Sequence, residues 1–303
     1  MSDKRPIGFV GLGNMGAPMA RRLAKSGATL VLYDLRSEAL AAFAEDGGRF
    51  RLAQDIDELG RGCAVVITML PDSLAVRSAA LGGQDHPGFA AGLGRGSVVI
   101  DMSSSAPMAT RALGETLAAR GVGLVDAPVS GGVPRARDGT LTIMAGGEAR
   151  LVDEVEPLLA AMGRVHRTGP LGSGHAMKAL NNYVSAAGLF AVCEALIVAR
   201  EFGLDPRVMN EVLKVSTGRN NTTDNKVEAY LLTRRFESGF ALDLMRKDVG
   251  TAEALAEELG LDAPWLRACS ALLDRAAGAL GQGADHTAAF AFLERQLTGR
   301  SGE

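Results

Sequence analysis

Lys178 and Asn182 are polar side chains in a run that is otherwise largely apolar, GSGHAMKALNNY at residues 172–183. In a helix, residues four apart lie on one face, so the amine and the amide are expected side by side. A lysine among apolar groups needs a partner or a function, because removing its charge from water is costly. One explanation is structural, with the ammonium extending to water beside a helix end. The other is catalytic, because burial lowers the pKa of a lysine and suits it to acid–base work.

A glycine-rich turn, GLGNMG, follows the apolar run 7–10 and precedes the helical pattern PMARRLAKSG. Gly11 would permit a tight turn, Gly13 would let the backbone approach a pyrophosphate, and Gly16 would let the helix pack on the strand. The helix N-terminus would present free N–H groups to phosphates. Although the spacing alone also fits an ordinary turn, this context favours a dinucleotide site. The predicted cofactor loop comprises Gly11, Gly13, Asn14, Met15 and Gly16.

Asp34 ends the next apolar run, about twenty residues after the glycine turn, where an acidic residue can accept hydrogen bonds from ribose hydroxyls. Its charge would repel a 2′-phosphate, so NAD is the favoured cofactor. Arg36 weakens this preference, because an arginine there could pair with that phosphate, and NADP stays the alternative.

Two further polar clusters lie later in the chain. In DAPVSGG, residues 126–132, successive N–H groups with little side chain in the way can hold an anion, although serine and glycine are also common in plain loops. The second cluster, RKD at residues 246–248, lies in an amphipathic helical pattern, and on its own it reads as a solvated charged face.

These residues require a fold of two parts to position them. Up to about residue 170, apolar runs rich in strand formers alternate with helical patterns, which predicts βαβ units and a mainly parallel sheet. Beyond that point only helical patterns recur. We expect a Rossmann-type doubly wound parallel sheet over residues 1–168 and an all-helical substrate and oligomerisation domain over 169–303. The expected strands are 7–10, TLVLYD, CAVVITML, SVVIDMS, GLVDAPV and LTIMAGG.

Composition excludes several classes of protein. The net charge is −3 without a basic block, so no nucleic-acid partner is indicated. No secretory signal and no apolar run long enough to span a membrane is apparent. The three cysteines form no C-x-x-C pair, which suggests small buried hydrophobes in a reducing, cytoplasmic compartment. The four histidines make no metal-ligand spacing with them, so no metal is predicted.

Four motifs in order resemble the β-hydroxyacid dehydrogenase family, which includes 3-hydroxyisobutyrate dehydrogenase and tartronate semialdehyde reductase. The likeness runs along nearly the whole chain. IGFVGLGNMGAPMARRL is similar to the cofactor loop of that family, DAPVSGG followed by GTLTIMAGG to its substrate loop, GSGHAMKALNN to its catalytic helix, and LMRKD to its late lysine motif.

The resemblance implies a role for each matching position. Lys178 would be the catalytic lysine, and Asn182 would help to hold the substrate beside it. The substrate carboxylate would bind at Ser130, Gly131 and Gly132. The groups near the cofactor would be Leu70, Pro71, Ser104 and Lys247, although relatives often carry threonine in place of Ser104.

The activity implied is hydride transfer between NAD(P) and a small β-hydroxy acid. The apolar character of the helical part suggests subunit contacts, so we expect a homodimer or homotetramer. The alternatives are an oxidative decarboxylase of the 6-phosphogluconate dehydrogenase type, for which the chain looks short, and a non-catalytic NAD-binding module. An imine-reducing relative would have replaced the lysine, so Lys178 argues against that activity.

Overall fold

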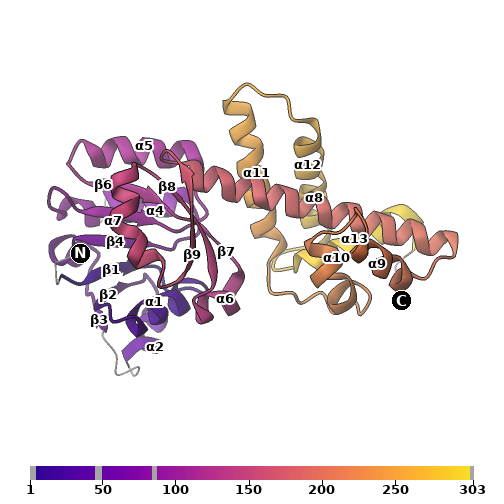
Figure 1. Ribbon diagram of the computed structural model, residues 1–303, viewed down its shortest axis with the longest axis horizontal. Helices are drawn as coiled ribbons and strands as arrows, with labels where there is room; N and C mark the ends of the chain where they lie inside the picture. The colour runs from indigo at the N-terminus through magenta and orange to yellow at the C-terminus, as the bar shows by residue number, and fades with distance from the viewer. Residues whose placement is uncertain (1–4, 45–49, 84–86, 301–303) are drawn as a thin grey trace. The chain divides into compact units, whose positions relative to one another are not determined.

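The computed structural model describes residues 5–44, 50–83 and 87–300, and the chain divides into two compact units, Met1–Lys178 and Ala179–Glu303. Helix α8 (Ser173–Phe202) runs without a break from the first unit into the second (Figure 1). The expected domain boundary at 168/169 stays a prediction.

The first unit is built on one mostly parallel sheet with the order β3-β2-β1-β4-β5-β6-β8-β7, and β9 pairs with β8. Strands β1, β2, β3, β4, β5 and β6 are parallel, and β8 runs antiparallel to β6 and β7 but parallel to β9. The strands are β1 (Ile7–Val10), β2 (Leu30–Tyr33), β3 (Phe50–Leu52), β4 (Val65–Thr68), β5 (Val98–Asp101), β6 (Gly123–Asp126), β7 (Val129–Ser130), β8 (Leu141–Gly146) and β9 (Gly163–Gly169).

Alternate residues of the central strands fill two separate cores. Ile67 and Ile100 belong to one cluster, with buried residues of α1, α6 and α7, whereas Val66 and Val99 belong to the other, with residues of α3, α4 and α5. Because side chains alternate across a strand, the sheet is buried on both faces, as a parallel sheet between helices requires. The helices of this unit are α1 (Gly16–Lys25), α2 (Ser37–Ala44), α3 (Asp57–Gly62), α4 (Ser73–Leu81), α5 (Pro107–Ala118), α6 (Gly132–Asp138) and α7 (Ala149–Leu159), with a 3₁₀ turn η1 (Phe89–Ala91).

The regular elements in the described part of the second unit are helices, around a core contributed by α8, α11, α12 and α13. Asp205 caps α9, and α12 has Pro264 at its first position, where a missing N–H costs nothing. Besides α8, the elements are α9 (Pro206–Val215), α10 (Asn221–Asn225), a π-helical turn η2 (Val227–Leu231), α11 (Leu242–Glu258), α12 (Pro264–Leu280), a 3₁₀ turn η3 (His286–Ala288) and α13 (Ala289–Thr298).

The predicted Rossmann-type sheet and helical second part are both confirmed. Two expectations need correction. β3 and β9 were missed, because Phe50–Leu52 is short and GRVHRTG is polar; among the described strands β9 pairs only with β8, as an edge strand does. The expectation of no membrane-length run was also wrong, because α8 is long and apolar enough by composition to span a bilayer; half of that stretch is buried inside the protein, as in core helices of soluble proteins.

Candidate active site

The glycine turn after β1 is shaped for close backbone approach. Gly11 has φ +96°, and a Cβ on Gly11 or Gly16 would overlap with backbone oxygens, of Met69 and Gly11 respectively. At Gly13 the nearest atom to such a Cβ is the Arg36 Nη2, 3.8 Å away, so the backbone there faces open space. A turn that is tight at both ends and bare in the middle fits a pyrophosphate at the start of α1.

Asp34 lies beside this turn and accepts hydrogen bonds from Leu12 and Arg36. Its carboxylate accepts the Leu12 N–H at 2.7 Å and, from Arg36, the backbone N–H at 2.9 Å and Nε at 3.2 Å. Partial burial would raise the pKa of Asp34, but the hydrogen bonds from Arg36 and Leu12 outweigh it and hold that pKa below its usual value. The carboxylate is therefore ionised near neutral pH, although Arg36 already shares its oxygens.

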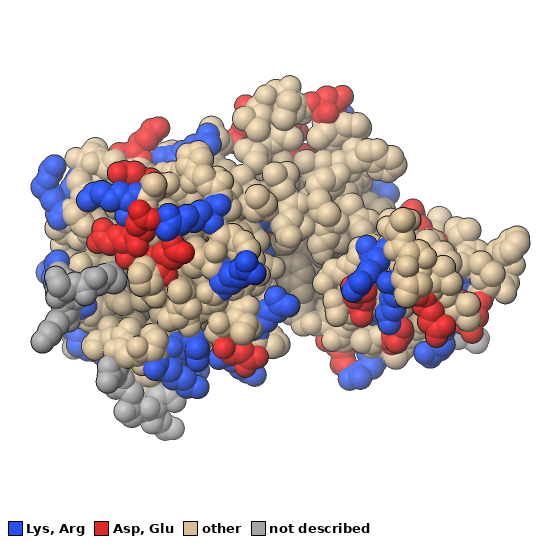
Figure 2. Space-filling model, in the orientation of Figure 1, with Lys and Arg blue, Asp and Glu red and all other residues tan. Residues whose placement is uncertain are grey.

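A cavity of about 660 Å³ adjoins the glycine turn and carries an excess of positive charge. Figure 2 shows lysine and arginine side chains gathered on this unit near α1 and α2. Such a pocket suits the anionic part of a dinucleotide, so the residues present fit a nicotinamide cofactor. The lining residues include Gly13, Asn14, Arg21, Arg22, Lys25, Arg36, Glu38 and Arg137.

The DAPVSGG segment is more ordered than the plain loop expected from its composition. Ser130 ends β7, paired with Thr142 of β8, and Gly132 begins α6. Gly131 and Gly132 have φ values of +132° and +70°, and a Cβ on Gly131 would lie 2.5 Å from Cδ of Arg135. The glycines form a strand-to-helix turn, so this segment is not a plain loop, and the side chain of Arg135 lies against Gly131.

The loops after β4 and β5 are tied together. The Leu70 N–H donates to Ser103 Oγ at 2.9 Å, and the Ser103 N–H donates to the Asp101 carboxylate at 3.0 Å. Leu70–Pro71 and Ser104 are the segments expected near the nicotinamide. The bond from Leu70 to Ser103 joins the two loops that carry them, at the carboxyl ends of the strands, where ligands of such sheets bind.

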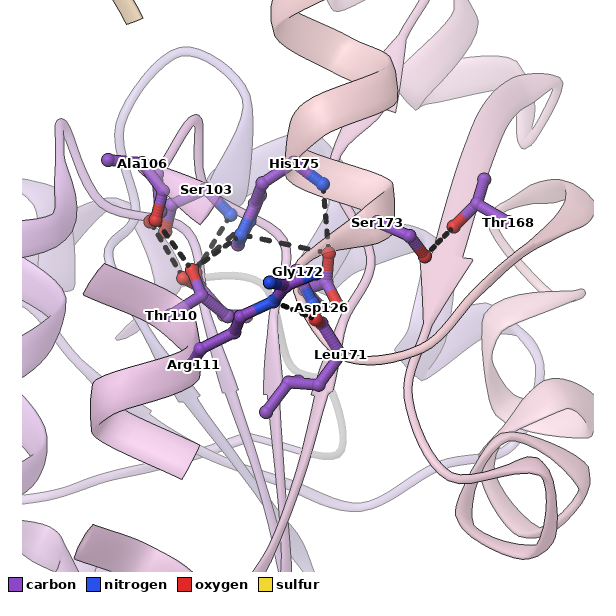
Figure 3. Close-up of polar contacts among 12 residues, drawn as sticks. Ser103, Ala106, Thr110, Arg111, Asp126, Thr168, Leu171, Gly172, Ser173 and His175 are labelled. Atoms are coloured by element: carbon purple, nitrogen blue, oxygen red, sulfur yellow. Dashed lines mark hydrogen bonds and ion pairs between the residues drawn. The ribbon is translucent and has the colours of Figure 1, made fainter. Parts of the chain in front are cut away.

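The first turn of α8 is anchored to the same end of the sheet (Figure 3). Asp126, at the end of β6, accepts the Gly172 and His175 N–H groups, both at 2.8 Å, and so caps the N-terminus of α8. A Cβ on Gly174 would overlap with Met144 O of β8, which explains the second glycine of GSG. Ser173 Oγ lies 2.7 Å from Thr168 Oγ1.

Lys178 is half-buried on α8, five residues after the helix begins, and Asn182 lies four residues farther on the same face. Asn182 is buried, and its Nδ2 donates to the buried Asp248 at 2.5 Å; Lys247 Nζ lies 3.6 Å from the other oxygen of Asp248. The second unit thus unites Asn182, Lys247 and Asp248 from two expected motifs, and the RKD segment is not a plain solvated face.

Other sequence expectations had mixed outcomes. The three cysteines are free and buried, as expected. The apolar run around Lys178 is not buried on all sides, because Met177, Leu180 and Val184 are exposed. His175, Asp101 and Asp126 were missed as site residues. Asp101 and Asp126 could have been found from the sequence, because each is a polar residue that ends an apolar strand. In the described residues no group of side chains that could hold a metal ion is found, and His86 lies outside them.

Comparison with known proteins adds the family. Residues 6–172 match the model of the NAD binding domain of 6-phosphogluconate dehydrogenase, and residues 172–293 match that of the NAD-binding domain of NADP-dependent 3-hydroxyisobutyrate dehydrogenase. The chain is 32% identical to 2-(hydroxymethyl)glutarate dehydrogenase of Eubacterium barkeri, over 99% of this chain and 98% of the relative. It is 37% identical to 3-hydroxyisobutyrate dehydrogenase of Pseudomonas aeruginosa, over 85% and 87%. The structure of the Mycobacterium tuberculosis 3-hydroxyisobutyrate dehydrogenase with L-serine superposes with a TM-score of 0.86 at 29% identity, over 95% and 99% of the two chains.

Proposed function

The chain belongs to the β-hydroxyacid dehydrogenase family, and we propose that it acts on a small β-hydroxy acid with Lys178 as the group that handles the proton. As a member of this family it is an NAD(P)-dependent oxidoreductase acting on a CH–OH group. The observation that carries the proposal is the placement of Lys178 on a helix anchored to the carboxyl end of β6.

The reaction divides into two transfers. The bound nicotinamide supplies a hydride acceptor. As the C–H bond of the alcohol breaks, neutral Lys178 Nζ accepts the hydroxyl proton and the carbonyl forms. In the reducing direction the Lys178 ammonium returns this proton to the carbonyl oxygen.

The neighbouring groups would hold the substrate. The backbone N–H groups of Ser130, Gly131 and Gly132 suit a carboxylate, since successive amides form an anion cradle. The amide of Asn182, oriented by its hydrogen bond to Asp248, would bind the substrate without adding charge next to the lysine. Lys247 would contact the cofactor.

NAD is the proposed cofactor of preference. The ionised Asp34 at the ribose position supports it, because it accepts hydroxyl donors and repels a 2′-phosphate. Arg36 and the other cations of the neighbouring cavity could pair with a 2′-phosphate, so NADP remains the alternative cofactor. The oxidative decarboxylase and the non-catalytic binding module are not favoured by the comparisons.

A homodimer or homotetramer is part of the same proposal. Helix α8 carries a stripe of seven apolar residues that are not buried. Successive members are 4, 3, 4, 4, 3 and 4 positions apart, so the spacing is the same in both chain directions. A two-fold axis at Ala191 would set Val184 of one copy against Val198 of the other, as an isologous interface requires. The α8 stripe comprises Leu180, Val184, Ala187, Ala191, Ala195, Val198 and Phe202.

Cytoplasmic location completes the proposal and is supported by the three free cysteines, which suit a reducing compartment.

The activity is tested with purified protein, NAD and NADP in parallel, and a panel of 3-hydroxyisobutyrate, D-glycerate, L-serine, threonate, 3-hydroxypropionate and 2-(hydroxymethyl)glutarate. We expect reduction of the nicotinamide with at least one β-hydroxy acid and no release of carbon dioxide in the primary step. Binding of NAD without turnover of any member would support the binding module instead.

A further inference from the structure

A buried carboxylate–histidine cluster lies beside the catalytic helix and has no part in the reaction described above. It consists of Asp101 at the end of β5, Asp126 at the end of β6, and His175 in the first turn of α8; all three are almost completely buried. His175 Nε2 lies 3.7 Å from Asp101 Oδ2, and Nδ1 lies 3.8 Å from Asp126 Oδ2. The imidazole therefore sits between two carboxylates.

The hydrogen-bond network assigns the proton on one ring nitrogen. The Thr110 hydroxyl donates to Ala106 O at 3.1 Å, so its oxygen accepts from His175 Nδ1–H at 2.8 Å (Figure 3). Nε2 is buried and makes no hydrogen bond within the described part of the chain. Such an atom in a native structure calls for an explanation, since a buried polar group without a partner is costly.

Each carboxylate of the cluster governs a different part of the site. Asp126 accepts the N–H groups of Gly172 and His175, which fixes the helix that bears Lys178. Asp101 accepts from the Ser103 N–H and from Ser105 Oγ, at 3.0 and 2.7 Å, and so fixes the loop after β5.

The loop after β5 in turn reaches the segment beside the proposed nicotinamide position. Ser103 Oγ accepts the Leu70 N–H, so the turn after β4 is held by the same network. His175 contacts α5 through Thr110 and lies within 4 Å of both carboxylates, which makes it the residue where the helix and loop halves of the network meet.

We propose that His175 is a positioning residue that fixes Lys178, three residues farther along α8, relative to the loops that would line the nicotinamide. The proposal rests on the proposed function of Lys178. Hydride and proton must leave one CH–OH group together, so a small displacement of the amine relative to the hydride acceptor slows the chemical step while leaving both ligands bound. A misplacement of about 1 Å can lower a rate by about 100-fold.

The test compares His175→Phe, which keeps a ring but removes both nitrogens, with His175→Asn, whose side-chain amide can still donate toward Thr110. Ser173→Ala is the matched control, because it removes a hydrogen bond from the same helical turn without touching Asp101 or Asp126. The readouts are kcat and KM, the kinetic isotope effect on kcat with the best panel substrate deuterated at its carbinol carbon, and NAD titration.

We expect His175→Phe to lower kcat about 10- to 100-fold with NAD affinity unchanged, and to raise the isotope effect because the chemical step becomes rate-limiting. His175→Asn should recover part of this loss. A merely structural histidine would reduce the amount of folded enzyme, which changes neither the isotope effect nor KM. An isotope effect unchanged in His175→Phe, or equally raised in Ser173→Ala, would overturn the proposal.

Amide hydrogen exchange keeps the test independent of the substrate. Residues 102–106 and 173–178 should both exchange faster in His175→Phe, whereas only 173–178 should do so in Ser173→Ala. If only one of the two segments exchanges faster in His175→Phe, the proposal is contradicted. This result does not depend on turnover of any panel substrate by the wild type. Absence of such turnover would count against the proposed function alone. If His175→Phe does not fold, His175→Gln, which lacks the donor position toward Thr110, takes its place in both measurements.

Discussion

Lys178 is the residue on which the proposed chemistry depends most directly. Replacing it by methionine keeps a side chain of similar length, so the fold should persist, with equal or slightly higher thermal stability because no partly buried cation remains. Turnover should fall by about two to four orders of magnitude, the usual contribution of a positioned proton donor or acceptor. The measurement is kcat, alongside thermal melting and NAD titration.

Lys178→Arg is the matched variant for this prediction, because it preserves positive charge but cannot lose a proton near neutral pH. It should fail nearly as severely as Lys178→Met. A Lys178→Met enzyme that melts normally, binds NAD and turns over near the wild-type rate would return the lysine to a structural role.

At the ribose position, Asp34 and Arg36 decide between the two cofactors. Asp34→Ser removes the charge that opposes a 2′-phosphate and releases the guanidinium now bonded to it. The ratio of kcat/KM for NADP over NAD should rise about 10- to 100-fold, which corresponds to one hydrogen bond with a charged group. Glu38→Gln, which changes an acidic residue that lines the neighbouring cavity, should change the ratio far less. Wild-type preference for NADP would refute the assignment.

At the scale of elements, the sequence predicted most closely those segments whose packing is periodic and apolar. The central strands lie within their expected runs, because burial on both faces of the sheet leaves a direct pattern. β3 and β9 have no such pattern, since Phe50–Leu52 is short and Gly163–Gly169 is polar, and only pairing with a neighbour makes them strands.

The candidate site was predictable in part for the same reason. Lys178 and Asn182 stood out as polar groups in an apolar run, and the glycine turn had a fixed spacing. The bonds from Asp126 to α8 and from Asp248 to Asn182 join residues 49 and 66 positions apart in sequence, and local patterns carry no information on such pairs.

Glu294 joins α13 to Arg200 and Arg234 by ion pairs, and its contribution to stability depends on pH. The carboxylate is buried and pairs with Arg200 of α8 and with Arg234, which donates at 2.9 Å. Burial would raise the pKa of Glu294, but the hydrogen bonds and charges of the two arginines outweigh it, so its pKa lies below the usual value. A carboxylate with a lowered folded-state pKa stabilises the protein above its unfolded pKa of about 4.3, and this contribution is lost as pH falls through the folded value.

Glu294→Gln should therefore lower the free energy of unfolding by about 3 kcal/mol at pH 7, near the low end for breaking a buried pair because both arginines are partly exposed. The difference from wild type should shrink as pH falls below about 4. Urea unfolding at several pH values measures it. Glu201→Gln, which removes the exposed partner of Arg200, should change stability by about 0.5 kcal/mol or less, and an equal effect of both variants would contradict a buried anchor.

At the scale of the whole molecule, α8 combines three structural roles along its length. Its first turn is fixed to the sheet by Asp126, its next residues include Lys178 and Asn182, and its remaining length presents the α8 stripe. Exposed large apolar side chains on that stripe, Val184 at 67%, Val198 at 63% and Phe202 at 82%, are unusual for a surface that faces water alone. A second copy that covers them would also support the helix that holds Lys178, the residue proposed to handle the proton.

This arrangement predicts that Ala191→Glu separates the subunits. Ala191 lies at the centre of the palindromic spacing, so two antiparallel copies would place the new carboxylates face to face, where small side chains otherwise permit close helix approach. Like charges so placed cost several kcal/mol, so the dissociation constant should rise by about 100-fold or more. Light scattering after size-exclusion chromatography, across a dilution series, measures it. Ala254→Glu adds the same charge at an exposed position of α11 and should leave the mass unchanged. If the wild type is monomeric, or if Ala191→Glu assembles as tightly as the wild type, the α8 stripe is not the subunit interface.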